Sequence, residues 1–562
     1  MTGKVRRIGR KLTFTNPSIE KSAPLESGLM PVYALTAGLT QKSMRIIIKQ
    51  ALDSFGHALS DVFPDGFRTA YDLTDLTFAI KNIHFPQNEQ ALEIAKRRLV
   101  FEELLLFCVA LSKREKENMQ NAVPLLADNA AAQRFLERLG FTPTSAQIRV
   151  MHEIANDLKQ TKPMNRLLQG DVGSGKTMPA FYAMHLCVQS GFQCAMMVPT
   201  EVLAIQHFAA ASRIFCDIGI NLELITGSMS AAHRQTVLQN TASGQTDIII
   251  GTHAVLYDRV QFAKLGLIIT DEQHRFGVGQ RALLESKTRA PHILTMSATP
   301  IPRSLALILY GETNLSVLDE MPPGRLPVKT YRIPEAKRKD MYGFLEKEIA
   351  KGAQVFVVCP AVEESTDIHL CSAEQRYAQL MARFSGFQVV LLHGRQKPEE
   401  KNSVLLKFKN KECSILVSTT VIEVGVDIPA ATIMVIENAD RFGLSQLHQL
   451  RGRVGRGTLQ SYCFLMSHEK DNKRLDILCK TNDGFKIAEH DLVLRGPGQF
   501  LGDRQSGGCD LYMSGLIKDI KMLQEARRIA DSIKKSDPSL YLHLAQYADI
   551  RYSHKFDKMS IN

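Results

Sequence analysis

A glycine-rich segment of this 562-residue chain has residues suited to binding a triphosphate. Gly170, Gly175, Lys176 and Thr177 fit the pattern Gly-x-x-x-x-Gly-Lys-Thr. Gly173 and Gly175 would let the backbone turn so that N–H groups point into one concavity, and a helix beginning near Lys176 would add its positive end. Lys176 would neutralise the β and γ phosphates, and the Thr177 hydroxyl would be a ligand of Mg²⁺. The predicted nucleotide site therefore comprises Gly170, Asp171, Val172, Gly173, Ser174, Gly175, Lys176 and Thr177.

Two acidic residues follow a hydrophobic stretch about 100 residues further along the chain. Residues 267–270 run directly into Asp271 and Glu272. A strand that ends in two acids places both carboxylates at the sheet edge, beside the loop that ends the first strand. Asp271 would hold Mg²⁺ through water, and Glu272 would orient and deprotonate the attacking water. The glycine-rich segment alone could be a chance turn before a helix, but together the two motifs predict nucleotide hydrolysis.

The charge balance favours a polyanionic partner. The chain has 69 Lys and Arg against 58 Asp and Glu, which gives a formal net charge of +11. Nucleic acid would suit such a chain, and a solvated basic surface is the alternative. The 10 cysteines are scattered, without Cys-x-x-Cys or zinc spacing, which predicts a reduced, cytosolic protein without a structural metal site. No apolar run reaches 18 residues, so the sequence predicts no membrane span.

Short apolar strands alternate with helices beyond about residue 120, which is typical of parallel sheets. One series precedes the Pro-Pro-Gly turn at 322–324 and a second follows it. The strand candidates are residues 193–198, 247–251, 265–270, 293–297, 354–359, 389–393, 414–418, 432–437 and 462–466. The sequence therefore predicts an α/β fold of two tandem RecA-like lobes, with parallel sheets flanked by helices and a nucleotide cleft between them.

The ends of the chain differ from this pattern. Residues 1 to about 25 are predicted to be the last strand of a β module, because residues 11–17 alternate like a strand. Apolar positions recur at helical spacing over residues 40–59, with Thr40 as the cap, and over residues 88–113, where core packing explains the leucines. A helical tail is expected from about 511 to 534.

These motifs resemble those of the superfamily of two-lobed nucleic-acid helicases and translocases. The resemblance implies that Phe141 packs on the adenine base and that Gln147 bonds to the edge of the base. It also makes Arg453 and Arg456 arginine fingers, since two arginines three residues apart would share one face of a helix. Such a guanidinium is worth about 10³ to 10⁵ in rate.

The same resemblance implies residues that grip the nucleic acid or couple it to the nucleotide site. Gln206 and His207 belong to one of these segments. The remaining residues are Pro199, Thr200, Thr226, Gly227, Thr252, His253, Ser297, Thr299, His393, Gly394, Arg395, Thr419, Arg495, Arg504 and Gln505.

Within the superfamily the sequence most resembles the RecG family of bacterial ATP-dependent helicases. The resemblance rests on residues 170–177, 271–281, 296–303, 483–491, 494–498 and 504–507. It implies an ATP- and Mg²⁺-dependent helicase that translocates on double-stranded DNA and remodels stalled forks and branched recombination intermediates in DNA repair. It further implies forked DNA and single-stranded-DNA-binding protein as partners, no membrane, and a monomer in the bacterial cytoplasm, associated with the nucleoid.

The predicted domain order follows from this resemblance. Residues 1–27 would be a remnant of the OB-fold wedge, 28–120 a helical connector, 121–319 the ATP-binding lobe 1, 320–478 lobe 2, and 479–562 a translocation hairpin, loop and helical tail. The chain departs from the family in starting so late in the wedge, and in having Gln396, Gln499 and Asp503 at three motif positions. An alternative reading is therefore a wedge-less relative that binds forks or junctions and hydrolyses ATP, but remodels DNA weakly.

Overall fold

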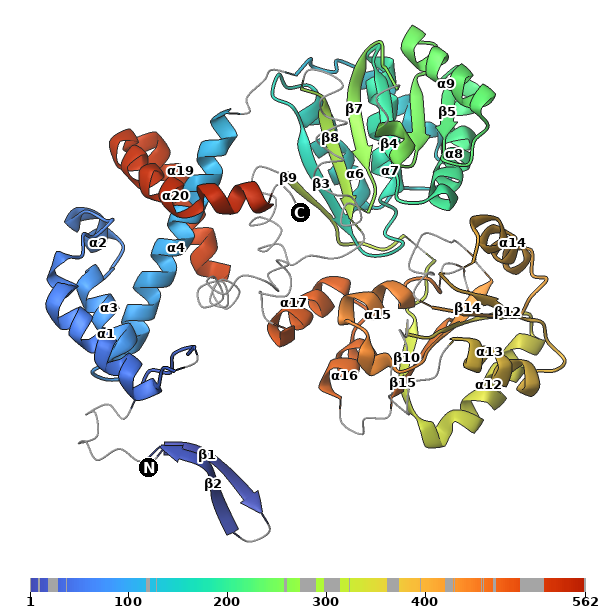
Figure 1. Ribbon diagram of the computed structural model, residues 1–562. Helices are drawn as coiled ribbons and strands as arrows, with labels where there is room; N and C mark the ends of the chain where they lie inside the picture. The colour runs from blue at the N-terminus through green and yellow to red at the C-terminus, as the bar shows by residue number, and fades with distance from the viewer. Residues whose placement is uncertain are drawn as a thin grey trace. The chain divides into compact units, whose positions relative to one another are not determined.

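The computed structural model divides into two compact units (Figure 1). One unit comprises residues 1–110 and 507–552, and the other comprises residues 111–506 and 553–562. The structure describes residues 2–8, 11–18, 29–36, 38–117, 122–127, 129–256, 260–272, 290–297, 314–322, 324–360, 373–394, 396–419, 428, 430–455, 457, 459–467, 472–495 and 520–559.

The first unit begins with an antiparallel hairpin of β1 (Thr2–Ile8) and β2 (Lys11–Ser18). Ile8 pairs with Lys11, so two residues join the strands. The predicted strand at 11–17 is confirmed, but the prediction of a single strand at this end was wrong. The sequence of β1 alternates poorly because it carries Lys4, Arg6 and Arg7, and alternation is the signal on which strand prediction depends.

The rest of the first unit is helical. Its helices are α1 (Gln41–Phe55), α2 (Asp65–Ala70), α3 (Leu76–His84), α4 (Glu89–Glu117), α19 (Ile520–Ser536) and α20 (Pro538–Met559). The predicted cap is confirmed, because the Thr40 hydroxyl oxygen accepts the N–H of Ser43 at 3.1 Å. The hydroxyl of Tyr552 in α20 donates to the carbonyl of Glu103 in α4 at 3.2 Å, so the carboxy-terminal helix packs on the long amino-terminal one.

Core packing explains the leucines of α4 but not the apolar face of α1. Leu104 and Leu105 are fully buried in α4. By contrast, α1 contains no buried residue, and Ile46 and Ile47 are about half exposed within the described part of the chain.

The second unit contains two α/β lobes. The first has a seven-stranded sheet in the order β5-β6-β4-β7-β8-β3-β9, with every ladder parallel. Its strands are β3 (Asn165–Gly170), β4 (Gln193–Met197), β5 (Leu222–Ile225), β6 (Ile248–Gly251), β7 (Leu265–Thr270), β8 (His292–Ser297) and β9 (Asn314–Leu318). Its helices are α5 (Asn129–Arg138), α6 (Ser145–Leu158), α7 (Thr177–Gln189), α8 (Glu201–Phe215) and α9 (Ala231–Ser243).

The second lobe has a six-stranded parallel sheet in the order β10-β15-β14-β11-β13-β12. Its strands are β10 (Lys329–Pro334), β11 (Gln354–Val358), β12 (Val389–Leu392), β13 (Ile415–Ser418), β14 (Ala431–Ile436) and β15 (Tyr462–Ser467). Its helices are α12 (Arg338–Ala350), α13 (Ala373–Arg383), α14 (Pro398–Lys409), α15 (Leu444–Arg451), α16 (Lys473–Lys480) and α17 (Gly484–Arg495).

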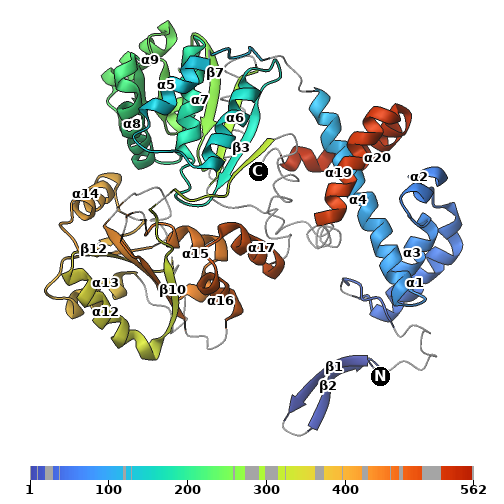
Figure 2. The same ribbon diagram turned by 180° about the vertical axis from the view of Figure 1, so that it is seen from behind.

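Both sheets are covered by helices on both faces (Figures 1 and 2). Along β4, Cys194 and Met196 enter the core that includes α6 and α7, whereas Ala195 and Met197 enter the core on the opposite face. Strands buried on both faces are continuously apolar, which is why the sequence revealed them. The predicted fold of two tandem lobes with parallel sheets is therefore confirmed. Within the described parts of the chain, no helix is both long and apolar enough to cross a bilayer.

Candidate active site

The turn predicted for residues 170–177 is present between β3 and α7. Gly173 and Gly175 have φ values of +81° and +83°, in a backbone region that residues other than glycine rarely adopt. Helix α7 begins at Thr177, directly after Lys176, as predicted. The loop therefore directs its chain into the start of a helix, which is the arrangement that binds phosphate.

Lys176 lies at the centre of a cluster of charges. Its ammonium nitrogen donates to the carbonyls of Gly170 and Asp171 at 2.8 and 2.9 Å. Burial lowers the pKa of Lys176, and the positive charge of Arg453 lowers it further, whereas Glu272, Asp271 and Asp171 raise it; the net pKa is below the usual value. Residues from both predicted motifs and from the second lobe therefore act on one ammonium group.

Asp271 follows β7 and is held by a histidine from the same lobe. The Nε2 atom of His207, on α8, lies 3.1 Å from an Asp271 carboxylate oxygen. Burial raises the pKa of Asp271, but the His207 hydrogen bond and the charge of Lys176 lower it more, so the net pKa is below the usual value. His207 was expected in a segment that grips DNA phosphates, and its side chain instead contacts the predicted Mg²⁺ ligand.

Glu272 has a backbone φ of +53°, which is uncommon for a residue other than glycine. Its N–H donates to the Asp271 carboxylate at 3.0 Å. Strained backbone of this kind persists where surrounding contacts impose it, and it concentrates at active sites. Both acids directly follow β7, and both act on the charge of Lys176.

Asp271 and Thr177 offer oxygen atoms of the kind that Mg²⁺ takes as ligands. No group of three or more His, Cys, Asp or Glu side chains in the described ranges could enclose an ion. Mg²⁺ is usually bound through one or two carboxylates together with phosphate oxygens and water. Asp271, kept anionic by its low pKa, and the Thr177 hydroxyl at the start of α7 fit that requirement.

The segment predicted to bind adenine is only partly placed for that role. Phe141 is half exposed, whereas Gln147 is buried. The Gln147 side chain accepts the N–H of Thr144 at 3.0 Å and points its amide nitrogen at the carbonyls of Ser174 and Gly175, 3.4 Å away. Gln147 thus links the start of α6 to the phosphate loop, and base recognition by Phe141 and Gln147 stays a prediction.

Arg453, one of the two predicted arginine fingers, is not on a helix. Helix α15 ends at Arg451, so Arg453 lies in the turn that follows, while Arg456 lies outside the described residues. The expectation that Arg453 lies on a helix was therefore wrong, and Gly455 turns the chain further with a φ of +75°. The role of the two arginines as fingers stays a prediction. Arg453 is nevertheless 5% exposed and close enough to Lys176 to affect its pKa.

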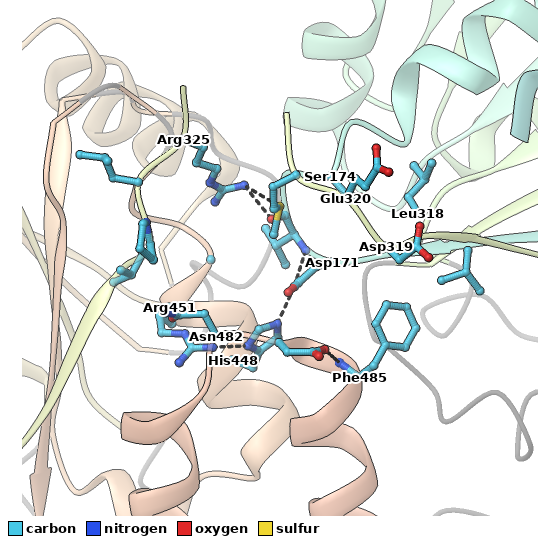
Figure 3. Close-up of a pocket in the computed structure, with 18 residues that line it drawn as sticks. Asp171, Ser174, Leu318, Asp319, Glu320, Arg325, His448, Arg451, Asn482 and Phe485 are labelled. Carbon is cyan, nitrogen blue, oxygen red and sulfur yellow. Dashed lines mark hydrogen bonds and ion pairs between the residues drawn. The ribbon is translucent and has the colours of Figure 1, made fainter. Parts of the chain in front are cut away.

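The lobes enclose a cavity of about 600 Å³ beside the phosphate loop (Figure 3). Asp171 and Val172 line it from the first lobe, and His448, Arg451 and Gly452 line it from the second. A methyl group on Gly452 would come within 2.6 Å of the Val172 side chain, so glycine is needed for this close approach.

Arg325, which follows Pro-Pro-Gly 322–324, bridges the phosphate loop and the turn after α15. Its guanidinium donates to the carbonyl of Val172 at 2.8 Å and to the carbonyl of Gly455 at 2.8 Å. A Cβ on Gly173 would lie 1.7 Å from one of its nitrogens, so the absence of a side chain at Gly173 also makes room for Arg325. Sequence analysis missed Arg325, although a cation directly after the turn between the lobes was a usable signal.

The described residues predicted to grip DNA follow neighbouring strands. Thr200, Thr226 and Thr252 come after β4, β5 and β6, which are adjacent in the first sheet. The hydroxyl of Thr200 caps α8, accepting the N–H of Leu203 at 3.4 Å. His393 and Thr419 follow β12 and β13, which are adjacent in the second sheet. Because parallel strands end at one edge, these segments share an edge within each lobe.

Comparisons with known proteins address the identity of the chain. Family models match in four segments: RecG wedge domain over residues 1–55, DEAD/DEAH box helicase over 144–308, helicase conserved C-terminal domain over 336–458, and RecG domain 3, C-terminal, over 481–550. The ATP-dependent DNA helicase RecG of Synechocystis is 45% identical over 96% of this chain and 67% of its own length.

The chain belongs to the RecG family. The RecG of Bacillus subtilis is 44% identical over 91% of this chain and 76% of its own length. A solved structure of RecG bound to a three-way DNA junction matches with a TM-score of 0.73 and 39% identity, over 93% of this chain and 70% of that one.

Some residues that the RecG resemblance singles out cannot be placed. Thr299, Arg395, Arg456, Arg504 and Gln505 lie outside the described residues, as do Gln499 and Asp503. Arg495 ends α17, and Ser297 ends β8. Gln396 supports its own loop, because its side chain accepts the N–H of His393 at 3.1 Å and donates to the carbonyl of Leu391 at 3.2 Å.

Proposed function

We propose that this RecG-family chain is an ATP-dependent helicase that translocates on double-stranded DNA and remodels forks and other branched DNA. One observation carries the proposal: Lys176 lies within electrostatic reach of the two acids of its own lobe and of Arg453 from the second lobe. Hydrolysis at such a site depends on how the lobes meet, which is what a motor needs. The relative bound to a three-way junction supports branched DNA as the substrate.

Each residue then has a defined task. Lys176 would bind the β and γ phosphates in exchange for the carbonyls that it now contacts. Glu272 would orient the attacking water and accept its proton, and Arg453 would contact the transferring phosphoryl group. Asp271 and Thr177 would hold Mg²⁺, which neutralises phosphate charge when bound.

The test is Lys176→Ala, assayed for ATP hydrolysis with a model replication fork and with plain duplex. We expect hydrolysis to fall to background, because the substitution removes the ammonium group that would neutralise the β and γ phosphates. Lys159→Ala, an exposed lysine of the same lobe, is the matched control and should retain activity. Normal fork-stimulated hydrolysis by Lys176→Ala would refute the assigned site.

The alternative is a relative that binds junctions but remodels them weakly. It rests on coverage, since the chain spans 67% and 76% of two curated relatives. Binding strength cannot separate the two functions, because phosphate contacts make both salt-sensitive. Turnover can: a fork that stimulates hydrolysis more than duplex supports the helicase, and a flat response supports the alternative. We further propose a monomer, with single-stranded-DNA-binding protein as a second partner, associated with the nucleoid of a bacterial cell.

A further inference from the structure

Asp171 faces two ways at the phosphate loop. Its carbonyl accepts a hydrogen bond from the ammonium group of Lys176 at 2.9 Å, so its backbone belongs to the nucleotide site. Its carboxylate points to the second lobe, where it lies 2.5 Å from His448 Nε2 (Figure 3). The backbone nitrogen of Gly484 lies 3.3 Å from the other carboxylate oxygen. A single residue therefore joins the lysine that would bind phosphate to two segments of the other lobe.

His448 continues the connection through a second hydrogen bond. Its Nδ1 atom lies 2.8 Å from a guanidinium nitrogen of Arg451. A guanidinium only donates, so Nδ1 accepts, and a neutral imidazole then carries its hydrogen on Nε2 and donates it to Asp171. His448 is 4% exposed and Asp171 is 8% exposed, so water cannot readily replace either partner.

The connection ends at the pair of helices that follows the second sheet. Arg451 donates to the carbonyls of Leu478 and Thr481 at 2.8 and 3.0 Å, where α16 ends. The N–H of Gly484 belongs to the first turn of α17, and a carboxylate is stabilised at a helix amino terminus. The phosphate loop thus contacts the end of α16 through two side chains and the start of α17 directly.

We propose that Asp171 and His448 form a latch between the lobes that passes the loading of the phosphate loop to α16 and α17. This inference rests on the proposed ATP-driven function. A triphosphate in the loop would compete with the Asp171 carbonyl for the ammonium group of Lys176. Rotation of the Asp171 peptide would then reorient the Asp171 carboxylate, which accepts hydrogen bonds from His448 and Gly484. His448 is then a positioning residue, because it acts through Asp171 and Arg451 and not on the nucleotide.

The experiment compares His448→Phe, which keeps a ring of similar shape without hydrogen bonds, with His448→Gln, which keeps a donor. Asp319→Asn is the matched control, since Asp319 lines the same cavity but pairs with Arg149 of its own lobe. The measurements are kcat and KM for ATP, and base pairs unwound per ATP on a fork. The 562-residue chain is used throughout.

We expect His448→Phe to lower base pairs unwound per ATP by about tenfold to a hundredfold, the range for losing a buried hydrogen bond to a charged group. The KM for ATP should change less than the unwinding yield. His448→Gln should recover part of the yield, and Asp319→Asn should match the unsubstituted chain. Combining His448→Phe with Asp171→Asn should lower the unwinding yield no more than the more severe of the two single substitutions does, because both remove the same hydrogen bond.

An unchanged unwinding yield in His448→Phe, with only a lower unfolding temperature, would reduce His448 to a packing residue and overturn the latch. The same conclusion follows if the Asp171 and His448 effects are additive. If His448→Phe fails to fold, the base pairs unwound per ATP by His448→Gln and Asp171→Asn decide the question: unchanged values in both would overturn the latch. A fork that stimulates no hydrolysis in either the unsubstituted chain or Asp319→Asn would refute the proposed function itself.

Discussion

Two aspartates of the first lobe each lie beside a histidine Nε2 atom, but the two histidines come from different lobes. Asp271 is 3.1 Å from His207, which lies on α8 of its own lobe. Asp171 is 2.5 Å from His448, which lies on α15 of the other lobe. The first contact survives any movement of the lobes, whereas the second requires that the lobes meet. We infer that contacts within the first lobe position the groups for hydrolysis, and that contacts from the second lobe control when hydrolysis proceeds.

The cations follow the same division. Lys176 is bound by carbonyls of its own lobe, while Arg453 reaches the site from the second. An arginine that arrives only on closure makes the rate of hydrolysis depend on lobe arrangement. Substitutions that remove a contact within the first lobe should therefore change the kinetics of hydrolysis differently from substitutions that remove a contact between the lobes.

Arg453→Ala should have the largest effect of the cross-lobe changes. We expect kcat for ATP hydrolysis to fall about 10³-fold or more, because the substitution removes charge from the transferring phosphoryl group. Single-turnover hydrolysis measures the step, and nucleotide binding should persist because Lys176 is intact. Arg383→Ala is the control, since Arg383 is a half-exposed residue of the same lobe paired with Glu346 at the surface. A loss of only a few fold would mean that Arg453 is not a finger.

His207→Leu tests the contact within one lobe. Removing the donor to Asp271 should lower kcat by about tenfold to a hundredfold, the range for a buried hydrogen bond to a charged group. The loss should be the same with and without DNA, because the contact does not depend on the lobes meeting. His207→Gln should restore part of it.

A loss in His207→Leu that appears only with DNA present would remove the distinction between the two histidines. It would mean that α8, which begins at the predicted DNA-gripping residue Thr200, transmits DNA binding to Asp271. The ratio of hydrolysis rates with and without a fork is the decisive quantity.

The candidate ranges covered most of the strands, including the edge strand β12, but not β3 or three of the other edge strands. Strands such as β7 are apolar throughout because both of their faces are covered. The strands that no candidate covered include β5, β9 and β10, each at the edge of its sheet, and their partly exposed residues weaken the apolar signal. The helix expected to carry Arg453 ends at Arg451, two residues before it.

The site was predictable where a motif is local and unpredictable where two lobes meet. The phosphate loop and the acid pair are short segments, and their geometry follows from strand, turn and helix. The His448 contact joins residues 277 apart in the chain, and the Arg325 contact to Val172 joins residues 153 apart. No local pattern specifies such distances, because they depend on how two complete sheets are placed against each other.

Arg325→Lys should give the smallest effect and the finest comparison. Arg325 donates to the carbonyls of Val172 and Gly455, and a lysine ammonium lacks the planar fork that reaches both. Losing one bond to a neutral acceptor is worth about twofold to tenfold in affinity, so the KM for ATP should rise by that factor with little change in kcat. Arg149→Lys, whose guanidinium donates to the carbonyl of Val317 at 2.7 Å within one lobe, should leave KM unchanged. Of these two arginines, only Arg325 joins the phosphate loop to the turn that carries Arg453. Equal effects of the two substitutions would therefore show that bridging the lobes adds nothing to nucleotide affinity.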